Sequence, residues 1–174
     1  KGTFGRVLAV AGSASYPGAA RLACEGAYRA GAGLVTLACP PLLQAIVATA
    51  LPEATYIPLD EAPTLMAKHT GRIGTALSAY DVLLIGPGLG QSESARDAAV
   101  GGILTAMPDN VRCCVIDADA LNALAFAEPW REYVPRPSVL TPHPGEMARL
   151  LRTSVEAVQG DRLNVAVGAA ATWG

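Results

Sequence analysis

The sequence predicts an α/β sandwich with a mostly parallel central sheet, formed as one domain over residues 1–174. The first observation behind this prediction is that short apolar runs alternate with longer helical patterns along the chain, as in sheets built from strand–helix–strand units. The second is the composition: 51% of the residues are hydrophobic and 16% are charged, which excludes a disordered chain. Only 5% are aromatic while alanine and glycine abound, so we expect helices packed closely against the sheet.

The apolar runs are predicted to be the strands. The runs at 6–12 and 81–88 contain or end in a glycine turn, as buried parallel strands do before a tight connection. The run at 54–59 contains Pro58, which cannot donate to a sheet ladder, so this strand is expected at an edge. In chain order, the predicted strands cover residues 6–12, 34–39, 54–59, 81–88, 112–119 and 138–142.

Helices are predicted between these strands and after the last one. The segment 18–31 has alanine and glycine along one face, and the segment 41–50 begins with proline at its first helical position. A helix is expected over 92–106, and a short one follows the strand at 112–119. Later in the chain, Thr153 and Glu156 have the spacing of a capping box. The apolar face of a final amphipathic helix is expected to consist of Leu163, Ala166, Val167, Ala170 and Ala171.

Charge and cysteine usage narrow the classes of function. The formal net charge is −2 and no basic block occurs, so we expect no nucleic-acid partner. The four cysteines lack zinc-site spacing, and we interpret them as small core residues of a cytoplasmic protein. Residues 30–52 carry no charge, but Pro40 and Pro41 divide them, so we expect a strand and a helix rather than a membrane span. The chain begins without methionine, so we expect that it starts inside a longer protein.

Ligands of parallel sheets bind outside the carboxyl ends of the strands, so the loops that follow strands form the candidate site. In the loop 11–20, Gly12, Ser13 and Gly18 would expose backbone amides to an anion, although an ordinary strand-to-helix turn explains them equally well. In the loop 85–94, three glycines in five residues would let a phosphate or a flat ring approach. The spacing of these glycines is neither that of a dinucleotide-binding fingerprint nor that of a P-loop.

Two carboxylates follow the strand at 112–119. Asp117 and Asp119 emerge where this apolar run ends. They could hold Mg²⁺, orient a ribose or position a reacting hydroxyl group. The alternative is that one of them caps the next helix while the other is a solvated acid.

The last strand-end loop contains a histidine that helix formation does not require. Thr141 or His143 can cap a helix that begins at Pro144, and Glu146 would then lie in its first turn, where the helix dipole favours a carboxylate. Serine or asparagine caps better than histidine, so we interpret His143 as a ligand contact rather than a cap. The other histidine, His69, lies in a polar segment and is expected to be exposed.

Several short stretches together form a recognisable pattern: KGTFGRVLAVAGS (1–13), YPGAA (16–20), RAGAGLVTLA (29–38), LPEA (51–54), IGPGLG (85–90), DADALN (117–122), TPHPGE (141–146) and DRL (161–163). In this order they resemble the ADP/ATP-dependent NAD(P)H-hydrate dehydratases, relatives of ribokinase that repair hydrated nicotinamide cofactors. Each stretch alone is only modestly specific. Their combination extends over essentially the whole chain.

The resemblance implies a ribokinase-like three-layer sandwich and a reaction that begins like that of a kinase. ADP, or ATP in some members, would phosphorylate the hydroxyl group on the ring of the S-form of NAD(P)H hydrate, with Mg²⁺ as the accompanying ion. Elimination of phosphate would then restore NAD(P)H and leave AMP. A homo-oligomer, with four subunits, is also implied.

The resemblance also implies which residues contact the substrate. These are Ala19, Gly88 and His143, with the histidine presenting a ring nitrogen. We expect Gly86, Asp117 and Asn122 to shape the same pocket, and we expect no resident metal site.

The family pattern continues beyond the residues of this chain. A Lys-Gly motif that contacts the nucleotide follows, and then a Gly-Thr-Gly-Asp motif whose aspartate is the catalytic base. We therefore expect residues 1–174 to be the amino-terminal and central part of the domain, with the base beyond Gly174. Two other functions stay open: a ribokinase-like kinase that acts on a hydroxylated vitamin precursor, and a non-catalytic nucleotide-binding module.

Overall fold

The computed structural model describes residues 2–60 and 62–174 and contains one six-stranded sheet. All neighbouring strands in it run parallel, which confirms the predicted α/β class. The strands are β1 (Arg6–Val10), β2 (Leu34–Cys39), β3 (Thr55–Pro58), β4 (Val82–Ile85), β5 (Cys113–Ile116) and β6 (Ser138–Leu140). Their order across the sheet is β3-β2-β1-β4-β5-β6, so the proline-containing strand β3 lies at an edge, as predicted.

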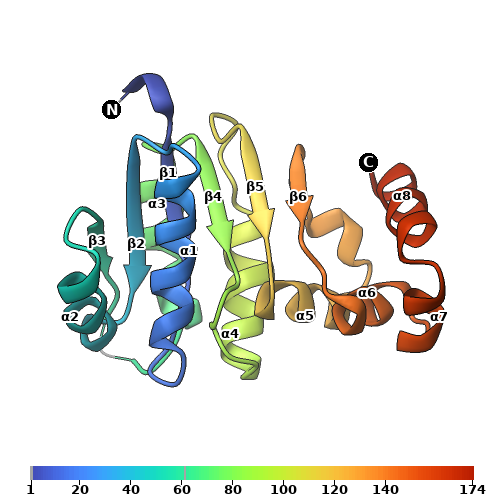
Figure 1. Cartoon of the computed structure of the whole chain (residues 1–174). Helices are drawn as coiled ribbons and strands as arrows, with labels where there is room; N and C mark the ends of the chain where they lie inside the picture. Colours follow the sequence, from blue (N-terminus) through green and yellow to red (C-terminus); the bar gives the residue numbers. More distant parts are fainter. Residues whose placement is uncertain (1, 61) are drawn as a thin grey trace.

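Helices cover both faces of the sheet, which gives three layers (Figure 1). On one face lie α1 (Pro17–Arg29) and α2 (Pro41–Ala50). On the other lie α3 (Thr70–Leu77) and a π-helical segment (Ala98–Leu104) that continues α4 (Glu93–Asp97). The later helices are α5 (Asp119–Phe126), α6 (Pro144–Leu151), α7 (Val155–Gly160) and α8 (Arg162–Trp173). Short 3-10 segments cover Gly2–Phe4, Ala67–His69 and Trp130–Tyr133.

The core is divided by the sheet, because successive side chains of a strand point to opposite faces. In β1, Leu8 and Val10 belong to the cluster on the α3 face, whereas Ala9 belongs to the cluster under α1 and α2. Each of these three residues is completely buried. Strands buried on both faces need apolar residues at every position, which explains the uninterrupted apolar runs of the sequence.

The order of the strands places a crevice at the centre of the sheet. The chain builds β1, β2 and β3 toward one edge, then returns to pair β4 with the other side of β1. At such a reversal the connections leave the sheet on opposite sides, and ligands bind between them at the carboxyl ends of the strands. The loops that follow β1 and β4 flank this point. Figure 1 shows these ends at the bottom of the sheet.

The predicted helix over 92–106 is not one regular helix. It is α-helical over Glu93–Asp97 and π-helical over Ala98–Leu104. A Cβ atom on Gly102 would lie 2.3 Å from Cγ2 of Thr70, at the start of α3. The glycine therefore permits close packing of the π-helical segment against α3, a tertiary contact that helical periodicity does not reveal.

The capping prediction for α7 is wrong. The hydroxyl of Ser154, rather than that of Thr153, accepts a hydrogen bond from the amide of Ala157. Thr153 belongs to the end of the preceding helix, where its amide donates to the carbonyl of Ala148. Arg152 adopts a left-handed conformation that ends α6, and Ser154 rather than Thr153 then precedes α7.

The apolar face predicted for α8 is also wrong. Leu163 is 75% exposed and Val167 is 61% exposed, whereas Ala169 is buried. The helix packs through Ala169 and the half-buried Val165 against a small cluster formed by α6 and α7. The packed face is therefore set by the position of these two helices, and the larger apolar residues of α8 stay in solvent.

Most cysteines are buried, and the uncharged stretch 30–52 is divided between a strand and a helix. Cys24, Cys39 and Cys114 are buried, as predicted, and Cys113 is half-buried. Burial raises the pKa of the Cys24, Cys39 and Cys114 thiols to about 12, so they are protonated at neutral pH. The uncharged stretch 30–52 forms β2 and α2, as predicted. Within residues 2–60 and 62–174, no helix combines the length and apolar character that crossing a bilayer requires.

His69 is buried, with 2% of its surface exposed, so the prediction that it is exposed is wrong. Its Nδ1 atom accepts a hydrogen bond of 3.1 Å from the amide of Met66, which closes the turn before α3. Its Nε2 atom is buried without a partner in the described part of the chain. Burial lowers the pKa of His69, and Lys68 lowers it further, while Asp60 acts in the opposite direction.

This burial predicts a pH-dependent stability. The pKa of His69 is lower in the folded chain than its ordinary value of 6.5, so the unfolded chain takes up the proton first as the pH falls. The neutral, buried His69 contributes fully to the stability of the folded chain above pH 6.5. This contribution is lost as the pH falls from 6.5 toward the lower pKa that His69 has in the folded chain. Between about pH 7.5 and about pH 5.5, the free energy of unfolding should fall further for the wild type than for His69→Asn, which keeps an acceptor but does not titrate. Urea unfolding measures both changes, and equal losses would contradict the prediction.

Candidate functional site

The loops that follow β1 and β4 are in direct contact at the carboxyl edge of the sheet. The amide of Gly12 donates a 2.7 Å hydrogen bond to the carbonyl of Pro87. Gly88 has a positive φ of 67°, and a Cβ atom there would lie 2.7 Å from Cβ of Ala19 and 2.8 Å from Cβ of Tyr16. Two of the predicted substrate contacts, Ala19 and Gly88, are therefore neighbours. Gly88 is required by its own backbone angle and by this packing.

The next contact along the edge joins the loops after β4 and β5. Gly86 has a φ of +127°, and a Cβ atom there would lie 1.8 Å from the carbonyl oxygen of Asp117. It would also lie 2.8 Å from Cβ of Ala120. No side chain fits in this space, so glycine is a requirement of the fold at this position.

Both aspartates of the predicted pair bind other loops. Asp117 accepts a 2.7 Å hydrogen bond from the hydroxyl of Thr141, which follows β6. Asp119 accepts a 2.9 Å hydrogen bond from the amide of Gly90, in the glycine-rich loop. The alternative that one of them caps α5 is wrong, because Ala118 is the cap residue and no side chain bonds the first turn. The two carboxylates hold the glycine-rich loop and the loop after β6 beside the end of β5.

The described residues do not form a metal site. Within residues 2–60 and 62–174, no group of three His, Cys, Asp or Glu side chains could hold an ion. The two aspartates at the edge are already hydrogen-bonded to Thr141 and Gly90. Mg²⁺ is usually bound by one or two carboxylates together with substrate phosphates. These side chains alone therefore do not fit a resident Mg²⁺ ion.

The prediction that Gly12 offers its amide to an anion is wrong. That amide donates to Pro87, and the neighbouring amides of Ala14 and Tyr16 donate to the carbonyls of Pro63 and Ser13. The partners Pro87 and Pro63 come from loops far away in the sequence. The first turn of α1, from residue 18 onward, still has amides that lack partners within the helix.

A further segment contributes to the site without a sequence signal. The carbonyl of Pro63 accepts a 2.8 Å hydrogen bond from Ala14, and the hydroxyl of Thr64 donates to the carbonyl of Leu89. Leu65, between these contacts and His69, is almost completely buried. Residues 62–66 are thereby fixed against both glycine-containing loops.

His143 caps α6, contrary to the interpretation that it is not a cap. Its Nδ1 atom accepts a 3.0 Å hydrogen bond from the amide of Gly145. Glu146 completes a capping box, because its Oε2 atom accepts a 2.9 Å hydrogen bond from the amide of His143. Oε1 of Glu146 lies 3.1 Å from Nε2 of His143. Nδ1 is therefore occupied by the cap, and the expectation that the histidine presents a ring nitrogen to a substrate stays a prediction for Nε2.

Asn122 lies near the start of α5, the helix that follows Asp117. It is buried, and its Oδ1 atom accepts a 2.8 Å hydrogen bond from Arg149 of α6. This bond joins α5 to α6. A place for Asn122 in the substrate pocket stays a prediction.

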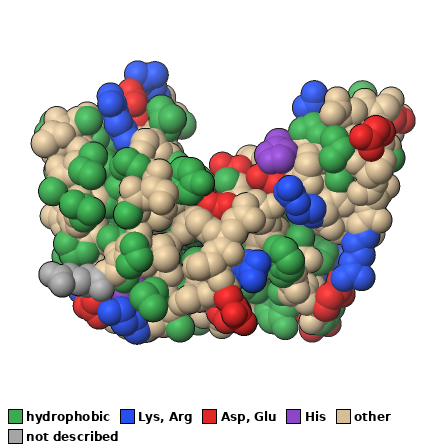
Figure 2. Space-filling view, turned by 90° about the horizontal axis from the view of Figure 1, so that it is seen from below, with side chains coloured by type: hydrophobic (Ala, Val, Ile, Leu, Met, Phe, Trp, Pro, Cys, Tyr) green, Lys and Arg blue, Asp and Glu red, His purple; other side chains and the backbone are tan. Residues whose placement is uncertain are grey.

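Figure 2 views the carboxyl edge and shows it hollowed between two flanks, with acidic side chains and an exposed histidine at the hollow. His143, whose side chain is 62% exposed, follows β6 at this edge. The contacts described above follow one another along this edge. Ala19 lies against Gly88, Gly86 of the same loop lies against Asp117, and Asp117 bonds Thr141 in the loop that carries His143. The arrangement offers backbone and one exposed imidazole, with carboxylates beside it.

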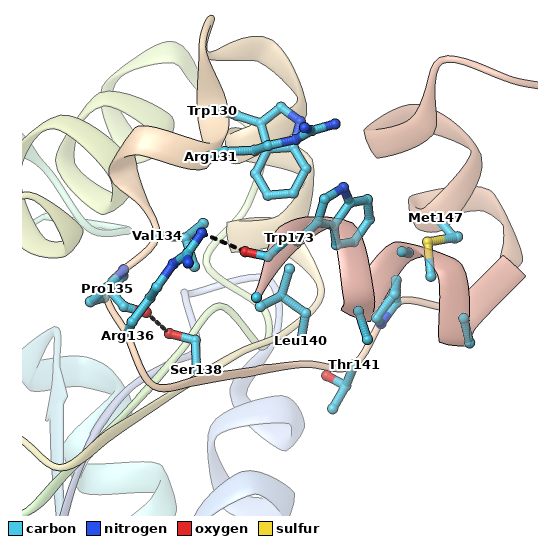
Figure 3. Close-up of a pocket in the computed structure, with 15 residues that line it drawn as sticks. Trp130, Arg131, Val134, Pro135, Arg136, Ser138, Leu140, Thr141, Met147 and Trp173 are labelled. Carbon is cyan, nitrogen blue, oxygen red and sulfur yellow. Dashed lines mark hydrogen bonds between the residues drawn. The ribbon is translucent and has the colours of Figure 1, made fainter.

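The structure also has a groove of about 380 Å³ between β6 and α8 (Figure 3). Trp130 and Trp173 meet edge to face at 4.8 Å on one side of it, and Arg136 donates to the carbonyl of Trp173. None of the six predicted site residues lines this groove. Within the described residues β6 pairs only with β5, so the groove runs along an open edge of the sheet.

Glu146 and Thr141 contact predicted site residues, although the sequence argument did not assign them to the site. Glu146 is 5% exposed and contacts His143 through both carboxylate oxygens. The spacing of His143 and Glu146 is that of a capping box with histidine in the place of serine or threonine. This spacing could have predicted the contact between Glu146 and His143 from the sequence.

The close approach at Gly86 predicts a severe effect of substitution. Gly86→Ala should lower the free energy of unfolding by about 3 kcal/mol or more, because the new Cβ atom overlaps a carbonyl oxygen and the backbone angle is strained. Gly26→Ala is the matched control, since a Cβ atom there meets nothing within 4 Å and the residue lies inside α1. The control should stabilise the chain by about 0.5–1 kcal/mol. Similar stabilities of the two variants in urea would disprove the contact.

Comparisons with known proteins agree with this geometry. A family model described as NAD(P)H-hydrate dehydratase matches residues 7–173. The chain is 44% identical over 176 residues to the bifunctional NAD(P)H-hydrate repair enzyme Nnr of Moorella thermoacetica, which covers 99% of this chain and 32% of that protein. It is 40% identical over 162 residues to the ADP-dependent (S)-NAD(P)H-hydrate dehydratase of Xanthomonas campestris, covering 90% of this chain and 53% of that protein. The chain thus spans about a third of the first relative and about half of the second.

Solved structures give the same family. The ADP/ATP-dependent NAD(P)H-hydrate dehydratase from Bacillus subtilis, co-crystallised with ATP/Mg²⁺, matches with a TM-score of 0.72 and 31% identity over 99% of this chain and 56% of that chain. A ribokinase-like superfamily protein from Enterococcus faecalis matches with a TM-score of 0.72 and 26% identity over 89% of this chain and 51% of that chain. The chain therefore belongs to the NAD(P)H-hydrate dehydratase family and has a ribokinase-like α/β fold.

Proposed function

We propose that these residues bind the hydrated nicotinamide of an ADP-dependent dehydratase that converts the S-form of NAD(P)H hydrate back to NAD(P)H, with AMP and phosphate as the other products. One observation carries the proposal. Ala19, Gly88 and the His143 loop are joined by direct contacts across the carboxyl edge of a parallel sheet, at the point where strand order reverses. This is where open α/β sheets bind ligands, and the family match gives the class of ligand.

The chain's own residues would bind and orient the substrate. The glycine-rich loop brings backbone, rather than side chains, to the surface beside Ala19, which leaves room for a flat ring. His143 forms the wall at the other end of the same edge. The family pattern places its catalytic aspartate in a Gly-Thr-Gly-Asp motif, which residues 1–174 do not contain. We therefore propose that the catalytic base comes from outside residues 1–174.

The nucleotide is proposed to be ADP, or ATP in its place, accompanied by Mg²⁺. The relative from Xanthomonas campestris is named as ADP-dependent, and the Bacillus subtilis structure was obtained with ATP/Mg²⁺. The acidic side chains described above do not form an ion site of their own. Mg²⁺ would therefore be carried by the nucleotide phosphates.

The activity test compares this chain with a version extended by the second half of the Xanthomonas campestris relative, joined at residue 174. Each is incubated with hydrated NADH and ADP, and the absorbance of reduced nicotinamide is followed. We expect recovery of absorbance with the extended chain and none with residues 1–174 alone. Comparable turnover by both would place the base within these residues. Failure of both, with turnover of a hydroxylated vitamin precursor by the extended chain, would favour a kinase.

Gly88→Val should weaken binding of hydrated NADH much more than it alters the fold of the sheet. The valine side chain would displace Ala19 and Tyr16, and the backbone angle is unfavourable for a branched residue. We expect affinity to fall by about tenfold or more, measured by calorimetry on soluble protein. Circular dichroism controls for the helix and strand content. Unchanged affinity would remove Gly88 from the proposed site.

We also propose that the protein is a cytoplasmic homo-oligomer of four subunits. All four cysteines are free, in accord with a reducing compartment. Leu22 of α1 and Leu42 and Ile46 of α2 are 69%, 65% and 48% exposed, and α2 carries no charged residue. Such a surface is suited to contact another subunit. Light scattering coupled to size-exclusion chromatography measures the number of subunits, and a monomer at micromolar concentration would contradict the proposal.

A further inference from the structure

Residues 62–69, here called the bracing segment, precede α3 and lie against two of the strand-end loops. The carbonyl of Pro63 accepts a 2.8 Å hydrogen bond from the amide of Ala14, in the loop after β1. The hydroxyl of Thr64 donates to the carbonyl of Leu89, in the glycine-rich loop after β4. Both loops belong to the proposed substrate surface. The position of the bracing segment therefore affects that surface without contributing a side chain to it.

Few side chains hold the bracing segment to the core. Leu65 and His69 are 1% and 2% exposed, whereas Pro63 and Lys68 are exposed. An ion pair of 3.9 Å joins Lys68 to Asp60, but exposed ion pairs of this kind contribute little to stability. Segments with few buried contacts open at a lower free energy than the core of a protein. The bracing segment is thus held mainly by one leucine and one histidine.

His69 closes the end of the bracing segment through its ring. Its Nδ1 atom accepts a 3.1 Å hydrogen bond from the amide of Met66, and its own amide donates to the carbonyl of Met66 at 2.9 Å. Nδ1 must present a lone pair for this, so a neutral ring carries its hydrogen on Nε2. Protonation would add a hydrogen to Nδ1, facing the N–H group of Met66. The closed turn therefore accepts only the neutral ring.

The surroundings of the ring also favour its neutral form. Burial lowers the pKa of His69 from 6.5 and Lys68 lowers it further, while Asp60 raises it. The π-helical segment that packs against this turn has no ionisable side chain. The other helix packed there, α4, carries Glu93, Arg96 and Asp97. Opening of the bracing segment exposes the ring, so opening becomes more favourable as the pH falls below 6.5.

We propose that His69 is a positioning residue: its neutral ring holds the bracing segment against the loops after β1 and β4, and its protonation releases the segment and loosens the substrate surface. The part that concerns the substrate rests on the proposed function, because it assumes that hydrated NAD(P)H binds at these loops. The hold on the loops follows from the bonds of Met66, Pro63 and Thr64 alone. By linkage, a ligand that needs the closed segment disfavours protonation of His69 to the same extent.

Amide hydrogen exchange, measured by NMR as protection relative to an unstructured chain at the same pH, reports the opening. Protection of the Met66 and Ala14 amides should fall together in the wild type, by up to about tenfold per pH unit below 6.5. The amide of Leu8, in the buried strand β1, reports global unfolding and should stay better protected. Equal protection of Ala14 and Leu8 would overturn the local opening. A loss confined to Met66 would overturn the link to the site.

Two variants separate the charge of His69 from its role as an acceptor. His69→Asn keeps an acceptor for the amide of Met66 but does not titrate, so protection of Ala14 should change little between about pH 7.5 and about pH 5.5. His69→Leu stays apolar but has no acceptor, so protection of Ala14 should be low at both pH values. The melting temperature shows whether each variant folds, and His69→Asn suffices for the test. A wild-type pH dependence in His69→Asn would overturn the proposal.

Hydrated NADH tests the link to the substrate. At about pH 7 and at a free concentration about ten times the Kd from calorimetry, the ligand should raise the protection of Met66, Ala14 and Leu8 by about tenfold. A rise at Leu8 alone would show that the ligand binds equally well when the segment is open, and would overturn the role of His69 in the site. No rise at any of the three amides, together with the predicted pH dependence, would refute the proposed function and support the opening controlled by His69.

Discussion

The missing side chain at Gly86 is the constraint on which the carboxyl edge of this sheet depends. A Cβ atom there would lie 1.8 Å from the carbonyl oxygen of Asp117, so only glycine lets the loops after β4 and β5 lie this close. The same approach allows Asp119 to reach the amide of Gly90 and Asp117 to reach Thr141. Four strand-end loops thereby become one surface.

The polar groups of that surface are mostly used to hold the loops together. The carboxylates of Asp117 and Asp119, the amide of Gly12 and Nδ1 of His143 have hydrogen-bond partners within the chain. What remains for a ligand is exposed backbone, small side chains and the exposed imidazole of His143. Such a surface recognises shape more than charge, and it needs little rearrangement when a ligand binds, which lowers the entropic cost of binding. Such a surface is in accord with the proposed hydrated nicotinamide, whose ring is uncharged, rather than with a phosphate.

Sequence patterns predicted the strands, which depend on residues that are near one another in the chain. They did not predict side-chain burial and partners that depend on residues far away in the chain. The apolar runs predicted every strand, since a strand buried on both faces must be apolar throughout. The expectation that Ala19 and Gly88 share a site came from the family resemblance, and the structure makes these two residues neighbours. His69 was misjudged because its burial depends on the packing of the segment before α3. The partner of Asn122 was not predicted, because Arg149 belongs to another helix.

The central claim is that the joined loops at the carboxyl edge, and not the groove beside β6, bind the hydrated cofactor. The most direct measurement is a titration of the isotope-labelled chain with hydrated NADH, followed by amide NMR. The account predicts that signals of Ala19, Gly88 and His143 shift together at one affinity, while those of Trp130 and Trp173 stay unchanged. Shifts confined to the two tryptophans and their neighbours would contradict it and would move the binding site to the open edge of the sheet.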